Sequence, residues 1–167
     1  MTDWASSALD EQHELANFDC GVPVLDDWLR NQAVNAAKRG TAKTYVWTSI
    51  GGDRVVAYYA ITPHQVAREE VSSSLAGGLT GPVPAYLLGK LALDRSLHGG
   101  GHGAELLHDA LTRLVEAAEV ASGRLIVVDA IDDKAAAFYR KYDFKPVIGN
   151  SRRLVIKVAT VRKALGL

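Results

Sequence analysis

Hydrophobic and polar positions along the chain form two kinds of pattern. Short apolar runs predict strands, and apolar residues at helical spacing predict helices. Three apolar runs, 44–50, 54–62 and 86–93, are short and contain many β-branched, aromatic or leucine residues, as buried strands do. Between 103 and 122, apolar residues recur at helical spacing while charged residues occupy the opposite face. We therefore expect three strands, the first two joined by a hairpin turn, followed by one long amphipathic helix.

Weaker patterns predict the remaining elements. These are a strand over 13–19, a helix over 24–38, a loop over 72–84, a strand over 124–130, a helix over 134–141, and strands over 144–147 and 153–158. Gly40 marks the end of the first helix, and Asp132 or Asp133 caps the shorter one. The order β-α-β-β-β-α-β-α-β-β predicts an α/β (α+β) fold, with a mixed sheet of about six to seven strands and flanking helices.

Composition fits one globular domain over 1–167, with 48% hydrophobic residues, 23% charged residues and a net charge of zero. The charge is unevenly placed, since 138–167 holds eight bases and one acid. Such an end suits a polyanion (CoA, nucleic acid or an acidic protein), although a solvated charged edge explains it equally well.

The compartment is predicted from what the sequence lacks. The single cysteine, Cys20, excludes an internal disulfide framework and weakly favours a reducing compartment. No apolar run reaches transmembrane length, and the acidic start does not predict a signal peptide. We therefore expect a cytoplasmic protein that does not enter a membrane.

A glycine-rich turn joins the strand over 86–93 to the long helix, with glycines at 99, 100, 101 and 103. Glycine permits positive φ and close approach of the backbone to a ligand, and a helix start attracts anions, so the turn predicts a phosphate site. A nucleotide P-loop is excluded because Gly-Lys-Ser/Thr is absent. Gly99-x-Gly101-x-x-Ala104 fits a dinucleotide fingerprint, but residues 95–98 separate it too far from the strand. A plain surface loop is the other alternative.

The segment from His98 to Gly103 resembles the Gln/Arg-x-x-Gly-x-Gly/Ala pattern of the GNAT superfamily of N-acetyltransferases, with histidine in place of Gln or Arg. The resemblance implies acetyl-CoA as co-substrate and a sheet that splays at the acetyl-CoA site. The implied binding residues are Leu91, Ala92, Leu93, His98, Gly99, Gly100, Gly101, His102, Gly103 and Ala104. The two histidines have the spacing of a metal pair, but no carboxylate or cysteine pattern accompanies them, so we expect no metal.

The segment 138–144 is similar to the family pattern Phe-Tyr-x-x-x-Gly-Phe, with Asp143 in place of the glycine. In many members that tyrosine protonates the departing CoA thiolate, which implies that Tyr139 is the general acid. A tyrosine that only packs is the alternative. Candidate general bases are available by residue type alone: His64, Glu69, Glu70 and Asp94.

Two further segments, 22–29 (VPVLDDWL) and 82–94, look like the first helix and the central strand of the acetyltransferase toxins in bacterial type II toxin–antitoxin pairs. The resemblance covers about 18–157. It implies that the acceptor is the α-amine of an amino acid on tRNA, that acetylation blocks translation, that a ribbon-helix-helix antitoxin is the partner, and that a homodimer forms as in many relatives. An α-amine titrates at about 7.7 to 8.0 and so needs little help from a base.

On this hypothesis, basic side chains near the first helix and in the basic end contact tRNA phosphates. The residues expected to do so are Arg30, Lys38, Arg39, Lys43, Arg140 and Lys141. Two other functions stay open. The chain could acetylate a small-molecule or protein amine, or it could be a non-catalytic module that binds CoA or a dinucleotide.

Overall fold

The computed structural model describes residues 3–167; residues 1 and 2 of the predicted domain lie outside them. Seven strands and six α-helices within that range make a mixed α/β fold, as predicted. The chain divides into two compact units. Unit 1 consists of residues up to Thr62 together with Lys90–Ala110, and unit 2 consists of Pro63–Gly89 together with Leu111–Leu167.

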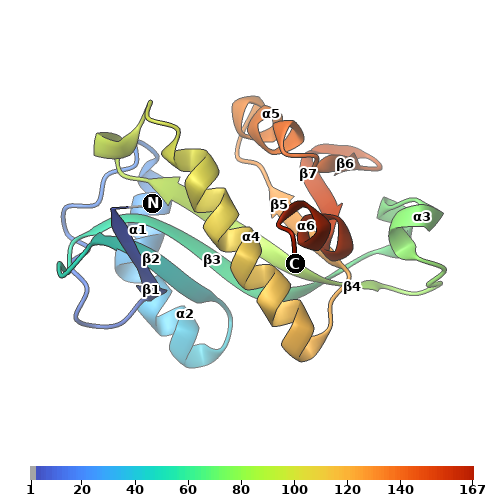
Figure 1. Cartoon of the computed structure of the whole chain (residues 1–167), viewed down its shortest axis with the longest axis horizontal. Helices are drawn as coiled ribbons and strands as arrows, with labels where there is room; N and C mark the ends of the chain where they lie inside the picture. The colour runs from blue at the N-terminus through green and yellow to red at the C-terminus, as the bar shows by residue number, and fades with distance from the viewer. Residues whose placement is uncertain (1–2) are drawn as a thin grey trace. The chain divides into compact units, whose positions relative to one another are not determined.

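Unit 1 contains the strand order β1-β2-β3-β4 (Figure 1). Its elements are β1 (Trp4–Ala8), α1 (Pro23–Asn31), α2 (Ala33–Arg39), β2 (Lys43–Ser49), the first part of β3 (Val55–Val66), the end of β4 (Val83–Leu93), the short 3₁₀ turn η2 (Arg95–Leu97) and the start of α4 (His102–Ala121). The strands β1, β2 and β3 pair antiparallel. Leu29 and Ala33 of the two helices pack against Phe18, Tyr58 and Ala92 and complete the apolar core of this unit.

The Asp109 carboxylate joins α4 to all three antiparallel strands of unit 1 through hydrogen bonds. Asp109 Oδ2 accepts hydrogen bonds from Ser6 Oγ on β1 (2.6 Å), Trp47 Nε1 on β2 (3.2 Å) and Tyr59 Oη on β3 (3.1 Å). Trp47 and Tyr59 are buried, so their polar atoms need an acceptor inside the protein. The helix that begins at the glycine turn is therefore held in place by a part-buried polar contact as well as by apolar packing.

Unit 2 contains the strand order β3-β4-β5-β7-β6 (Figure 1). Its further elements are η1 (Arg68–Glu70), α3 (Ser73–Ala76), β5 (Leu125–Asp129), α5 (Asp133–Lys141), β6 (Lys145–Val147), β7 (Asn150–Lys157) and α6 (Val158–Ala164). β5 runs parallel to β4, while β7 pairs antiparallel with both β5 and β6. The strand predicted over 124–130 is β5, and its first four residues are fully buried, as is usual for a strand in a parallel pair.

Three sequence predictions differ from the structure. Residues 13–19 are mostly irregular, with a short turn and one isolated bridge. The first strand is instead β1, whose sequence WASSA lacks a strand pattern. The helix predicted over 24–38 is interrupted at Gln32, where ψ of −28° accompanies φ of −128°. The predicted loop over 72–84 contains α3 and the first residues of β4. Gly40 does end α2, in the left-handed conformation.

Candidate functional site

The glycine turn of unit 1 has the backbone geometry that its composition predicts. Gly99 and Gly101 have φ of +81° and +77°, which side chains disfavour, and α4 begins directly afterwards at His102. The first residues of a helix present N–H groups with no acceptor inside the helix. In this turn those groups belong to His102, Gly103 and Ala104, three of the residues predicted to bind the cofactor.

Asp94 stabilises the segment that leads into this turn. Its carboxylate accepts hydrogen bonds from Ser96 N (3.1 Å), Ser96 Oγ (2.7 Å) and Asp19 N (3.0 Å), and its side chain is buried. Burial by itself would raise the pKa of Asp94, but these hydrogen bonds outweigh it and hold the pKa below its usual value. Asp94 is therefore an ionised structural anchor and is poorly suited to the role of general base.

Both histidines of the turn have partners inside unit 1. His98 Nε2 lies 2.9 Å from Leu93 O, so this nitrogen carries a proton and donates to the end of β4. His102 Nδ1 lies 2.9 Å from Glu105 Oε1, and its ring meets Trp4 edge-on. Within residues 3–167, no cluster of three His, Cys, Asp or Glu side chains is placed to hold a metal ion.

Tyr139 lies in unit 2, on α5, whose start is fixed by Asp132 because its Oδ1 accepts from Ala135 N (2.7 Å). The tyrosine is only 8% exposed, and its ring packs between Phe138 and Phe144 at centroid distances of 5.4 and 5.5 Å. Burial raises the pKa of Tyr139 above its usual value. The hydroxyl is therefore neutral at physiological pH and able to donate a proton.

Asp143, which stands in place of the family glycine, adopts the left-handed conformation that glycine favours, with φ of +71°. Aspartate tolerates this left-handed region better than most residues do. The turn is closed on Tyr139 O, which accepts from Tyr142 N (2.9 Å) and Phe144 N (3.3 Å). The local turn that ends α5 therefore accommodates aspartate at this position.

The six residues expected to contact tRNA divide between the units: Arg30, Lys38, Arg39 and Lys43 in unit 1, and Arg140 and Lys141 in unit 2. Two have partners already, since Arg30 Nη1 donates to Phe18 O (2.8 Å) and Lys38 Nζ lies 2.6 Å from Glu11 Oε1. All six are exposed.

The other candidate bases, all in unit 2, have mixed surroundings. His64 Nε2 is buried with no hydrogen-bond partner among the described residues, so it does not meet solvent. Glu70 Oε2 lies 3.8 Å from Arg153 Nη1, and Glu70 O accepts from Ile148 N. Glu69 is exposed. Glu70 therefore has a structural role, while Glu69 is a solvated acid.

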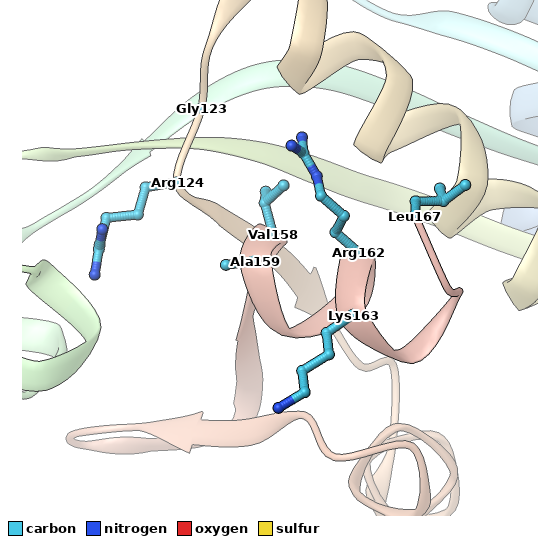
Figure 2. A pocket seen from close by; sticks show the side chains of 7 residues that line it. All are labelled: Gly123, Arg124, Val158, Ala159, Arg162, Lys163 and Leu167. Carbon is cyan, nitrogen blue, oxygen red and sulfur yellow. The ribbon is translucent and has the colours of Figure 1, made fainter.

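A hollow of about 490 Å³ in unit 2 lies near α6, but its cations do not converge. Figure 2 shows Arg124, Arg162 and Lys163 pointing in different directions from its wall. Arg124 Nε donates to Leu75 O (2.8 Å), and Arg162 Nη2 lies 3.6 Å from Glu119 Oε1. None of the predicted site residues lines this hollow, so it is a weak candidate for a substrate site.

An aromatic and cationic cluster in unit 1 was not predicted from the sequence. Lys90 Nζ lies 4.4 Å from the centroid of the Trp28 ring, which stacks on Tyr58 at 6.0 Å and 13°. Tyr58 Oη in turn donates to Leu25 O (2.7 Å). The available indication was a lone lysine inside the apolar strand sequence LLGKLAL.

Beside this cluster, Cys20 is buried, and its backbone N–H donates to Asp26 Oδ1 (2.9 Å). Burial raises the pKa of the Cys20 thiol to about 12, and the neighbouring Asp26 carboxylate acts in the same direction. The thiol is therefore held in its protonated form.

Comparison with known proteins places these features in a family. No family model matches the chain. A curated relative, the tRNA-acetylating toxin of Mycobacterium tuberculosis (strain ATCC 25618 / H37Rv), is 33% identical over 162 residues, which cover 97% of this chain and 96% of the relative. The chain belongs to the tRNA-acetylating toxins of the GNAT superfamily. The "Probable toxin TacT" of Sinorhizobium fredii (strain NBRC 101917 / NGR234) is 26% identical, covering 93% of this chain and 91% of the relative.

Solved structures of similar toxins have the same fold. AtaT complexed with acetyl-methionyl-tRNAfMet has a TM-score of 0.89 at 26% identity, covering 98% of this chain and 99% of that chain. AtaTR bound with AcCoA has a TM-score of 0.84 at 26% identity, covering 99% of each. An AtaT mutant bound to the C-terminus of the antitoxin AtaR (TM-score 0.87, 24% identity, covering 99% of this chain and 100% of that chain) supports the fold alone.

Since tRNA-acetylating toxins are acetyltransferases that use acetyl-CoA, the predicted enzyme class is confirmed. No helix within residues 3–167 has the length and apolar character to cross a membrane.

Proposed function

We propose that this chain transfers the acetyl group of acetyl-CoA to the α-amine of an amino acid carried on tRNA and thereby blocks translation. The observation that carries the proposal is the 33% identity with a tRNA-acetylating toxin, spread over 97% of the chain. We further propose that residues 1–167 act as one domain in the cytoplasm, that a ribbon-helix-helix antitoxin neutralises the protein, and that it forms a homodimer. The predicted site residues then take the following roles.

Acetyl-CoA binds to the end of β4 and the glycine turn. The backbone N–H and C=O groups of Leu91, Ala92 and Leu93 form hydrogen bonds with the pantetheine arm. The pyrophosphate lies against the turn from His98 to Ala104, where backbone N–H groups and the dipole of α4 favour negative charge. His98 supports the turn through its hydrogen bond to Leu93 O. Because its Nε2 proton is donated there, that proton is not available to the pyrophosphate.

The transfer itself requires one bond to form and one to break. The neutral α-amine attacks the thioester carbonyl carbon, the tetrahedral intermediate collapses, and the carbon–sulfur bond breaks. Tyr139 donates its phenolic proton to the departing thiolate, the proton released by the amine goes to solvent, and the Tyr139 phenolate then takes up one proton from solvent, which restores the enzyme. Because an α-amine titrates at about 7.7 to 8.0, part of the acceptor is neutral without a dedicated base. This agrees with the structural role found for Asp94.

Replacing Gly103 with valine is expected to reduce acetyl-CoA affinity at least tenfold while the fold is retained. Gly103 lies in the first turn of α4 and is not among the residues with positive φ, so valine fits the backbone there but places a branched side chain where the pyrophosphate must approach. Isothermal titration calorimetry measures the affinity, and circular dichroism checks the fold. Gly81→Val is the matched control, because a Cβ at Gly81 meets open space. Unchanged affinity in a folded Gly103→Val variant would refute the cofactor site.

The substrate is tested with purified protein, radiolabelled acetyl-CoA and a pool of aminoacyl-tRNA. Label is expected on the tRNA fraction, and mild alkaline deacylation of the pool beforehand should abolish it because the acceptor amine is removed. In a translation extract, protein synthesis should stop only when acetyl-CoA is present. Label found on proteins or small amines but not on tRNA would contradict the acceptor while leaving the enzyme class intact.

A further inference from the structure

The segment 22–29 is one of the two that resemble the toxins, and the structure explains two of its residues by contacts inside unit 1. Asp26 is buried and accepts the Cys20 N–H, and Leu29 is fully buried in the core of unit 1. Trp28 is different, because its side chain is half-buried and its ring has Tyr58 stacked on it and a lysine ammonium 4.4 Å from its centroid. A role beyond core packing is therefore open for Trp28.

Lys90 is an unusual residue for its position. It is half-buried within the apolar end of β4, and among residues 3–167 no carboxylate is paired with it. Partial burial lowers the pKa of its ammonium, since water solvates the charge less well there. The cation–π contact with the Trp28 ring attracts the ammonium but supplies no countercharge. The side chain is thus a cation that lacks an anionic partner.

The position of Lys90 relates it to the proposed transfer site within the same unit. It lies three positions before Leu93, whose carbonyl accepts a hydrogen bond from His98 at the start of the glycine turn. At about 3.3 Å per residue this is about 10 Å along the strand. Side chains alternate between the faces of a strand, so Lys90 shares the face of Ala92, which packs into the core beside α1. Leu91 and Leu93 point to the opposite face.

Resting on the proposed function, we propose that Lys90 binds a phosphate of the single-stranded 3′ end of the acceptor tRNA and that Trp28 positions its ammonium. Proteins bind single-stranded nucleic acid with cations placed beside aromatic side chains. The 3′ end carries the amino acid as an ester on its last ribose, and the ester and the ribose separate the reacting amine from the nearest phosphate, which suits a cation about 10 Å along β4 from the turn. Lys90 is accordingly a substrate-binding residue, and Trp28 is a positioning residue.

The test compares two acceptors that carry the same amino acid, the aminoacyl-tRNA that the wild-type chain acetylates and the corresponding 3′-O-aminoacyl-adenosine, which has no phosphate. Lys90→Met is expected to raise KM for the aminoacyl-tRNA about tenfold with kcat within about twofold, and to reduce the salt slope of kcat/KM by about one. The kinetics with aminoacyl-adenosine and the acetyl-CoA affinity should be unchanged. Lys90→Arg keeps the charge and should retain most of the wild-type KM.

Two further variants complete the design. Trp28→Leu should raise the KM for aminoacyl-tRNA in the same direction, because the ammonium loses its support, and Lys134→Met, at an exposed lysine of α5, should change nothing. Equal losses with both acceptors, or an unchanged salt slope in Lys90→Met, would overturn the phosphate contact. If the wild-type chain acetylates aminoacyl-adenosine and no tRNA, the acceptor in the proposed function is wrong and the phosphate contact fails with it.

Discussion

Replacing Tyr139 with phenylalanine is expected to lower turnover by about 10²- to 10⁴-fold, the usual effect of removing a positioned acid. The substitution deletes one oxygen and keeps the ring that packs between Phe138 and Phe144, so the fold should not change. Burial keeps the pKa of the Tyr139 hydroxyl above its usual value, so the proton is present whenever the thiolate leaves. Since the proton transfer occurs only in the transition state, the loss should appear in kcat more than in KM.

Steady-state release of free CoA measures this loss, and calorimetry checks that acetyl-CoA affinity is retained. Tyr142→Phe is the matched control, because Tyr142 is the next tyrosine along and caps the same helix. Expression of the Tyr139→Phe variant should also fail to arrest growth. Near-normal turnover in Tyr139→Phe would assign Tyr139 to packing alone and make Tyr142 the next acid to examine.

Replacing Asp109 with alanine is expected to lower the free energy of unfolding by about 1–3 kcal/mol, the usual cost of a buried donor, here Trp47 Nε1, that loses its acceptor. Two of the three donors that lose this acceptor, Trp47 Nε1 and Tyr59 Oη, belong to buried side chains. The variant also loses a contact that joins α4 to β1, β2 and β3. Asp109→Asn keeps one acceptor oxygen and should fall between the wild type and alanine.

Urea unfolding followed by circular dichroism measures the change in stability. Glu116→Ala provides the control, because Glu116 is an exposed acid of the same helix, where alanine is a favourable helix former. A loss below about 1 kcal/mol in Asp109→Ala would mean that water or rearranged side chains satisfy the three donors.

The predictions from sequence succeeded where one local pattern determines one local structure. The glycines at 99 and 101 adopt positive φ, α4 follows its apolar stripe, and Asp132 caps α5. They failed where distant partners decide. β1 is a strand because β2 pairs with it, although its own sequence, WASSA, has little strand propensity. The interruption at Gln32 was missed because the polar and apolar pattern continues across it.

The candidate site shows the same division. The backbone geometry of the glycine turn could be predicted because the glycines lie in one contiguous motif, whereas the role of Tyr139 stays a prediction. The contact between Lys90 and Trp28 joins residues 62 positions apart in the sequence, and no local pattern in either segment predicts that they meet. Likewise, the anchoring role of Asp94 depends on Asp19, which lies on a separate segment of unit 1. Only the tertiary structure could bring these pairs together.

Cys20 is the single cysteine of the chain and is buried, so the folded protein should react very slowly with thiol reagents. Such reagents attack the thiolate, and burial keeps the pKa of this thiol at about 12. A colorimetric assay of released CoA should therefore have little background from the enzyme itself. When the chain unfolds, one new reactive sulfur is exposed per molecule, so the same reagent counts unfolded chains in a variant. Activity and integrity can thus be followed in a single cuvette.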